Sequence, residues 1–503
     1  MHPFPLARVL TAAVVTVAAT GLFAAPVAGE PAGGRLLGVD KVLVVGMDGL
    51  RPDRIPAANA PTLDRMTADG TLATSLLYTS PMAQTVSGPG WSTIATGVWP
   101  DRHGVKDNTF AGKNYVTYPD FLTRLERIDP AYSTLAIADW AALIDQGTFS
   151  TSIDARVRFD GDRLGYRAQD VLVRDEAVRR LRDTSPDAAF VYFGETDEAG
   201  HRSGAASQAY LDAIGRQDVY LGQLLSTIRQ RPTYPQERWT VLVTTDHGHT
   251  DAGGHGGSSL AERQTFVLAT GPGIAAGARP TDTRLVDVAA TVFGQLGVGV
   301  TGVDGVPPQR RSADPFERVT LGPRVDETGI PASISGFTHA PPNGWAVDTS
   351  ALPTGGVTEW RGWSFTTDPF WTSAQRDQWR ELNVRSRGVF AVADSDEWDD
   401  KSHGAGRYDS ALTSAPYRVT GGTTTTLRYV THYRQEGAQQ ADVLVSFDGG
   451  PDTVVKTYTA DAVARAETIP VTVPAGATSV RVKFRYYDAA NNWYWAIDDV
   501  RVG

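Results

Sequence analysis

Histidines and carboxylates gather in one stretch of this chain. Between Asp197 and His255 the sequence reads DEAGH, TTDHGH and GGHGG, and this stretch holds four of the nine histidines. Histidine is the commonest protein ligand of zinc, and aspartate supplies the oxygen that completes a mixed nitrogen and oxygen set. The pattern predicts a metal site built from Asp197, His201, Asp246, His247 and His255.

Two segments further upstream add a carboxylate and a hydroxyl. Asp48 lies in VVGMDGL, and Ser87 lies in TVSGPGWST, two residues before Pro89 at the start of an expected helix. Serine at such a place is typical of a helix N-terminal cap, and a turn carboxylate is common without any catalytic role. A helix N-terminus beside a metal would also stabilise a serine alkoxide and an attacked phosphate. The combination favours a hydrolase over a protein with structural metals only.

The spacing of these residues indicates how they meet. Asp197 and His201 are four residues apart, so one helical turn would point both side chains at the same place, although a surface salt-bridge pair has the same spacing. We predict two sites, one formed by Asp48, Ser87, Asp246 and His247, and the other formed by Asp197, His201 and His255.

Glycines accompany the remaining histidines. Asp246 and His247 are adjacent at the end of an apolar run, where Gly248 gives the backbone freedom to bring their side chains together. Glycines on both sides of His255 allow its loop to approach a metal closely. We expect His249 to lie outside the ligand set, either as a neighbour of the ligands or at the surface.

The elements that must position these residues follow an alternating pattern. Apolar, β-branched runs at 41–47, 133–139, 188–194, 239–245 and 264–270 predict buried strands, and the segments from Ala168 and Ser207 have helical periodicity. This alternation predicts an α/β fold with a doubly wound, mostly parallel sheet. In such sheets ligands bind at the carboxyl ends of the strands, where Asp48, Asp197, Asp246 and His247 are expected.

The two ends of the chain differ from its middle. Residues 1–29 contain Arg8 followed by an apolar run and small residues, which predicts a secretory signal peptide rather than a membrane anchor, because the run is short for a bilayer. We therefore expect a secreted protein with no membrane span in its mature form. From about residue 310 short alternating runs predict an all-β jelly-roll or sandwich domain. We place the catalytic domain at 36–312 and the β domain at 318–503.

Composition excludes several function classes. The formal charge of -10 argues against a nucleic-acid binder, whereas a small anionic substrate is compatible with metals in the pocket. The chain has no cysteine, so disulfides and cysteine metal ligands are excluded.

The ordered segments GMDG, SGPGWSTIATGVWPDRHGV, DEAGH, TDHGH and GGHGG resemble the alkaline phosphatase superfamily over roughly residues 40–305. The chain is most similar to its type I phosphodiesterase and nucleotide pyrophosphatase branch. The resemblance implies an alkaline-phosphatase-like α/β domain with two zinc ions, which the seven residues of the two predicted sites would hold. It also implies that Ser87 is the nucleophile, where the family usually has Thr, and that Asn108 donates to a phosphate oxygen.

This resemblance implies a phosphodiesterase that acts on a small phosphoester through a phosphoseryl intermediate. An alkaline phosphomonoesterase is the alternative, and a sulfatase-like hydrolase is less favoured because Trp91 stands where the S-x-P-x-R motif has Arg. Gly90 and Trp91 also depart from the Asn and His that the phosphodiesterase branch commonly has. The same ligands accept Mn²⁺ as well as Zn²⁺.

The C-terminal part supports a different hypothesis, a surface-binding protein that contacts glycans. Its segments EWRGWSF, DSDEWDD and NNWYWAIDDV are rich in tryptophan and aspartate. Oxygen ligands of this kind suit a structural Ca²⁺, and the candidates are Asp394, Asp396, Asp399, Asp498 and Asp499. We favour the alternative that these acids are solvated and the tryptophans fill the sandwich core.

Overall fold

The computed structural model describes residues 38–281, 283–307 and 314–503, and Val39–Gly503 forms one compact unit. The predicted signal peptide, residues 1–29, lies outside the described residues. The limits of the two domains also stay a prediction, because residues 308–313, where the boundary is expected, lie outside the described residues. No helix within the described ranges is long and apolar enough to cross a membrane.

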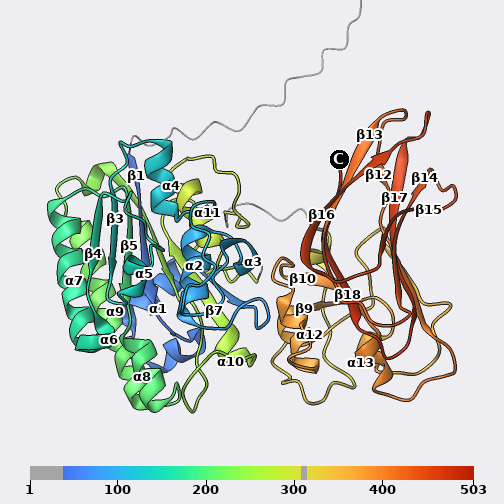
Figure 1. The fold of residues 1–503 in the computed structure, drawn as a ribbon, viewed down its shortest axis with the longest axis horizontal. Coiled ribbons are helices and arrows are strands. Elements are labelled where there is room, and N and C mark those ends of the chain that lie inside the picture. The colour runs from blue at the N-terminus through green and yellow to red at the C-terminus, as the bar shows by residue number, and fades with distance from the viewer. Residues whose placement is uncertain (1–37, 282, 308–313) are drawn as a thin grey trace, which may run out of the picture. The chain divides into compact units, whose positions relative to one another are not determined.

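A seven-stranded sheet forms the N-terminal half of this unit, with strand order β2-β7-β6-β1-β5-β3-β4 (Figure 1). The central strand β1 is parallel to both of its neighbours, β5 and β6, whereas β7 is antiparallel to β6 and β2. The prediction of a doubly wound, mostly parallel sheet is confirmed. The strands are β1 (Val39–Met47), β2 (Thr71–Leu76), β3 (Thr134–Ala138), β4 (Ala155–Arg158), β5 (Ala188–Phe193), β6 (Glu237–Thr244) and β7 (Gln264–Thr270).

Helices cover both faces of this sheet (Figure 1). Val42 and Val44 of β1 belong to the core beneath α2, α4 and α11, whereas Leu43 and Val45 belong to the core beneath α1, α7 and α9. This alternation buries β1 on both sides, as its continuous apolar run predicts. The helices are α1 (Pro61–Asp69), α2 (Ser87–Thr96), α3 (Pro100–His103), α4 (Phe121–Ile128), α5 (Ala142–Asp145), α6 (Gly161–Leu164), α7 (Tyr166–Asp183), α8 (Glu195–Ser203), α9 (Gln208–Arg229), α10 (Leu260–Arg263) and α11 (Asp287–Gln295).

Two antiparallel sheets form the C-terminal half, with orders β16-β13-β18-β10-β9 and β15-β14-β17-β11-β8, and β12 pairs with β17. The two sheets share one hydrophobic core, in which Phe484 of β17 meets Trp495 of β18 edge to face at 5.7 Å. The all-β sandwich prediction is confirmed.

The sandwich elements are β8 (Ala346–Asp348), β9 (Ser364–Thr367), β10 (Val389–Asp394), β11 (Tyr408–Thr413), β12 (Tyr417–Arg418), β13 (Thr424–Tyr433), β14 (Gln440–Phe447), β15 (Thr453–Tyr458), β16 (Ala462–Thr472), β17 (Ser479–Ala489), β18 (Tyr494–Val502), α12 (Asp368–Ala374) and α13 (Ser395–Asp399). The expectation that tryptophans fill this core is also confirmed. The fully buried ones are Trp360, Trp363, Trp371, Trp398 and Trp495.

Candidate metal centre

Ser87 is the first residue of α2, at the edge where β1 and β6 end. The N-cap residue of α2 is Val86, which has an extended backbone and makes no side-chain capping hydrogen bond. The prediction that Ser87 caps the helix is therefore wrong, because Val86 occupies the N-cap position. The hydroxyl is instead 3.2 Å from Nε2 of His247, so Ser87 Oγ faces the histidine that the sequence predicts beside it.

Asn108 lies next to the same helix end. Its Oδ1 accepts a hydrogen bond of 2.7 Å from the backbone N–H of Gly88. This contact satisfies one of the orphan N–H groups of the first turn of α2, which is the task that a cap residue usually performs. The structure thus places the side-chain amide of Asn108 at the first turn of α2, which begins with Ser87.

Three buried side chains meet opposite Ser87. Asp48 follows β1, and Asp246 and His247 follow β6, so the adjacent parallel strands deliver them to one edge of the sheet. Nε2 of His247 lies 3.4 Å from Oδ1 of Asp48 and 3.3 Å from Oδ2 of Asp246. Neither of these two oxygens accepts a hydrogen bond from any described residue, although both are buried.

Among the described residues, His247 is the basic side chain that the ion pairs place beside Asp48 and Asp246. Burial, together with the charge of Asp197, raises the pKa of Asp48 to about 6. Burial, together with the charges of Asp48 and Asp197, holds the pKa of Asp246 well above its usual range. Burial lowers the pKa of His247 to about 4, so this imidazole favours its neutral, metal-binding form. Buried carboxylates are normally paired with a cation. A divalent cation at this place would supply the missing charge.

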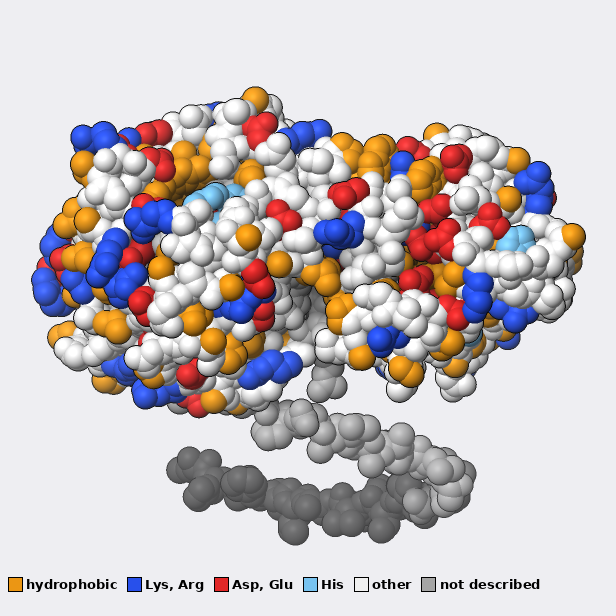
Figure 2. Space-filling model, turned by 90° about the horizontal axis from the view of Figure 1, so that it is seen from below, with side chains coloured by type: hydrophobic (Ala, Val, Ile, Leu, Met, Phe, Trp, Pro, Cys, Tyr) orange, Lys and Arg blue, Asp and Glu red, His pale blue; other side chains and the backbone are white. Residues whose placement is uncertain are grey.

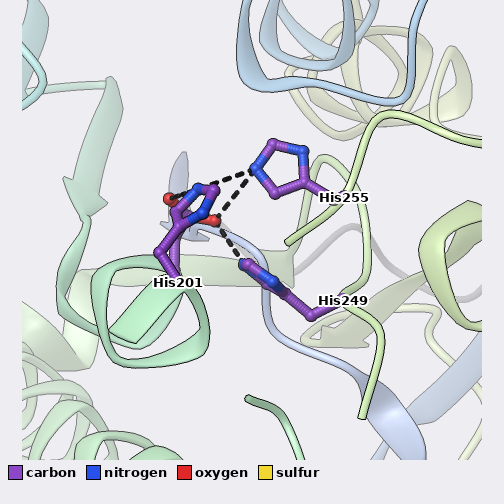
Figure 3. A group of neighbouring side chains, drawn as sticks. His201, His249 and His255 are labelled. Carbon is purple, nitrogen blue, oxygen red and sulfur yellow. Dashed lines mark hydrogen bonds and ion pairs between the residues drawn. The ribbon is translucent and has the colours of Figure 1, made fainter. Parts of the chain in front are cut away.

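A second group forms around Asp197 of α8. His249 Nε2 donates to Oδ1 of Asp197 at 2.6 Å, and His201 Nε2 lies 3.4 Å from Oδ2 of the same carboxylate. His255 Nε2 is 3.5 Å from Asp197 Oδ1 and 3.0 Å from His201 Nε2. Figure 3 shows the side chains of His201, His249 and His255 turned toward one another. The helical-turn prediction for Asp197 and His201 is confirmed.

The electrostatics of the second group follow from its histidines. Burial opposes ionisation of Asp197, but contacts from His201 and His249 hold its pKa well below the usual range. Asp197 raises the pKa of His201, whereas burial lowers the pKa of His255 to about 3. The centre opens to the surface at His201, whose side chain is 51% exposed. Histidine side chains are visible on the surface of the α/β half in Figure 2.

His249 is more closely tied to the centre than the sequence suggests. It is fully buried, so a surface position is wrong, and its donor atom lies within 4.8 Å of those of Asp197, His201 and His255. A Cβ atom added to Gly49 or Gly200 would come within 2.9 Å or 2.8 Å of the imidazole of His249. These glycines, in GMDG and DEAGH, make room for the ring. The repeated histidine in TDHGH was the signal that pointed to it.

The two groups share Asp197, which lies within 4.8 Å of the donor atoms of Asp48 and His247 as well. Nitrogen and carboxylate donors without sulfur fit Zn²⁺ and also Mn²⁺. The free oxygens of Asp48 and Asp246 are the observation that makes the donor set fit a metal.

Two aromatic residues that were not among the predicted site residues contact Asp48. Trp91 Nε1 donates to Asp48 Oδ2 at 2.8 Å, and the Tyr192 hydroxyl donates to the same oxygen at 2.5 Å. Trp91 was visible in the sequence only as a departure from the family pattern. Tyr192 was hidden in the apolar run of β5.

The acids considered as Ca²⁺ ligands in the sandwich contact other groups of the protein. The expectation that these acids are solvated is wrong for Asp394 and Asp498, because both are buried. Asp394 and Asp396 pair with Arg380, at 3.1 Å in each case, and Asp399 pairs with His403. Asp498 accepts from the backbone N–H of Arg387, and Asp499 pairs with Arg501. Within the described part of the chain, the acid and histidine groups whose donor atoms converge do not include these five residues.

The chain is similar to known proteins that are named as pyrophosphatases and phosphodiesterases. Ectonucleotide pyrophosphatase/phosphodiesterase family member 7 of Homo sapiens is 27% identical over 273 residues, which are 48% of this chain and 54% of that protein. Family member 3 of Rattus norvegicus is 24% identical over 225 residues, 41% of this chain and 24% of that protein. The chain thus spans about half the length, or less, of these curated relatives.

Among solved structures, murine ectonucleotide pyrophosphatase/phosphodiesterase 5 matches with a TM-score of 0.41 and 14% identity, covering 53% of this chain and 97% of that one. The family model described as type I phosphodiesterase / nucleotide pyrophosphatase matches residues 42–293, half of the chain, and these residues contain all the predicted ligands, Ser87 and Asn108. The chain belongs to the type I phosphodiesterase/nucleotide pyrophosphatase family.

Proposed function

We propose that this protein is a secreted, two-zinc phosphodiesterase that hydrolyses phosphoric diester or pyrophosphate-type bonds through a phosphoseryl intermediate. The observation that carries the proposal is the position of Ser87. Its hydroxyl lies at the first residue of α2 and 3.2 Å from Nε2 of His247, facing Asp48 and Asp246, each of which has one buried oxygen without a hydrogen-bond partner among the described residues. The names of the curated relatives, which are pyrophosphatases and phosphodiesterases, support the same reaction class.

The residues that would hold the metals form two sets. Asp48, Asp246, His247 and Ser87 surround the first position, and Asp197, His201 and His255 surround the second, with His249 in contact with Asp197. Bound zinc would lower the pKa of the serine hydroxyl and offset negative charge on the phosphate.

The protein's own groups would then carry the reaction. Ser87 Oγ attacks phosphorus and loses its proton, the P–O bond to the departing alcohol or phosphate breaks, and the leaving oxygen takes up a proton. Water then attacks the phosphoseryl group, releases the phosphoryl product and returns the proton to Ser87 Oγ. The N-terminus of α2 and the amide of Asn108 would stabilise the charged phosphate oxygens throughout.

The test compares bis-p-nitrophenyl phosphate with p-nitrophenyl phosphate as substrates of the full chain. We expect kcat/KM to favour the diester, and Ser87→Ala to reduce it by about 10³-fold or more. Ser87→Thr is the matched control, because it keeps the hydroxyl that the family usually presents. Preference for the monoester would assign the protein to the phosphatases, and unchanged activity in Ser87→Ala would exclude Ser87 as the nucleophile.

The metal and secretion parts of the proposal have separate tests. Elemental analysis of the purified protein should give two zinc ions per chain, and one or none would contradict the proposal, whereas manganese would change only the identity of the metal. Secretion is supported by the apolar run after Arg8 and has no support from the fold. Recovery of a shortened chain from the culture medium, with its new N-terminus near residue 30, would confirm it, and retention of the full chain inside the cell would refute it.

A further inference from the structure

Trp91 is a buried tryptophan that reaches from the nucleophile helix to a candidate metal ligand. It lies on α2, four residues after Ser87, so both side chains emerge from the same face of the helix. Its ring is fully buried, and its Nε1 donates to Oδ2 of Asp48 at 2.8 Å. The contact therefore joins α2 directly to the end of β1.

The packing around Trp91 leaves its ring little freedom to move. The indole lies against Gly46 of β1, where an added Cβ atom would come within 2.4 Å of the ring. It also meets Phe190 and Tyr192 of β5 edge to face, at 5.7 Å and 5.2 Å between ring centroids. The indole N–H is thus held at a defined place beneath the carboxylate of Asp48.

The two oxygens of Asp48 have different surroundings as a result. Oδ2 accepts hydrogen bonds from both Trp91 and Tyr192. Oδ1 accepts none from the described residues and lies 3.4 Å from Nε2 of His247. Two donors on one oxygen fix the plane of the carboxylate and leave the other oxygen facing the centre.

We propose that Trp91 is a positioning residue for the metal centre, which presents Asp48 to a cation through Oδ1 alone. The inference rests on the proposed metal-dependent function, because it assigns Asp48 as a metal ligand. Residues that hydrogen-bond to a metal-binding side chain commonly contribute about 10- to 100-fold to metal affinity. The contact uses an indole N–H, a donor that does not titrate in the physiological range.

The experiment measures zinc affinity of the full chain by competition with a chromogenic chelator after metal removal. Trp91→Phe keeps a buried aromatic ring and removes the donor, and we expect it to weaken one of the two zinc sites by about 10- to 100-fold. Trp99→Phe is the matched control, because Trp99 is equally buried in the same core and its ring contacts Tyr78. Trp91→His restores an N–H donor and should recover most of the lost affinity.

The outcomes separate this inference from the proposed function. If the wild type binds two zinc ions and Trp91→Phe binds them no more weakly than Trp99→Phe does, the positioning inference is overturned while the metal centre stands. Loss in Trp91→Phe without recovery in Trp91→His would assign the effect to packing and also overturn it. A wild type that binds no zinc would contradict both.

A second measurement does not depend on the folding of a variant. The indole N–H of Trp91 should give a nuclear magnetic resonance signal that shifts when zinc binds, because the carboxylate that accepts it becomes a ligand. The signal of Trp99 should stay in place. An unshifted Trp91 signal at saturating zinc would refute the inference.

Discussion

Gly90 offers a sharp test of how closely α2 and β6 must approach. It is the fourth residue of α2 and lies against Asp246, which follows β6. A Cβ atom at this position would stand 2.7 Å from Cβ of Asp246 and 2.7 Å from its carbonyl oxygen. Ordinary contact begins near 3.4 Å, so Gly90→Ala requires a separation of about 0.7 Å between the helix and the end of the strand.

This displacement falls between two groups that act together. Ser87 lies one turn before Gly90 on the same helix, and Asp246 is predicted to hold the metal that serves Ser87. A misplacement of about 1 Å can cost about 100-fold in rate, so we expect kcat/KM to fall by about 10- to 100-fold. Overpacking of this kind also destabilises the fold, typically by about 1–3 kcal/mol.

The assay measures kcat/KM on bis-p-nitrophenyl phosphate at saturating zinc, together with the Tm of each variant. Gly294→Ala is the control, because this glycine is also helical and its added Cβ would meet no atom closer than 3.3 Å. A folded Gly90→Ala protein with the activity of Gly294→Ala would refute the claim that this contact sets the geometry of the site.

Two further predictions concern the fold outside the site. Burial raises the pKa of Asp120 from 3.8 to about 6, so the folded state binds this proton more tightly than the unfolded state. The resulting stabilisation is present below about pH 4 and is lost as the pH rises through 6. Relative to Asp120→Asn, the free energy of unfolding measured with urea should fall by about 3 kcal/mol over this range. A difference between the two proteins that stays constant with pH would contradict this prediction. Arg380 is the buried cation among Asp394, Asp396 and Glu397, so Arg380→Met should cost about 3–5 kcal/mol of sandwich stability while kcat below the transition stays unchanged. Equal Tm values for Arg380→Met and the charge-preserving Arg380→Lys would show that the pairing does not stabilise the sandwich.

Buried strands were predictable because burial on both faces leaves a continuous apolar run. The runs at 41–47 and 188–194 match β1 and β5 to within two residues. The edge strands β2 and β4 left no such signal, since their residues are partly exposed. The direction of β7 was not predictable either, because an antiparallel strand buried on both faces has the same composition as a parallel one.

Convergence of the ligands was predictable for a related reason. Strand ends in a parallel sheet lie at one edge, so Asp48 and Asp246 could be placed together from their positions in the chain alone. The details that depend on packing between elements were not. The helix cap is an example, because the N–H group of Gly88 is satisfied by Asn108, twenty residues away. The contact between Trp91 and Asp48 likewise depends on how α2 lies on β1.

The central position of β1 in the sheet affects how the protein folds during synthesis. Both of its partners come later in the chain: β5 begins at Ala188, and β6 ends at Thr244. During synthesis β1 emerges before both partner strands, and about 140 residues separate its end from the start of β5. Pairing over such sequence distances is slow. The contact between Gly49 and Asp246 closes a loop of 197 residues. Fragments that stop before β6 lack Asp246, His247 and His255, three of the seven predicted metal ligands, and they expose an unpaired strand edge. Refolding yield should therefore depend on protein concentration, and zinc should bind only in the final stage of folding.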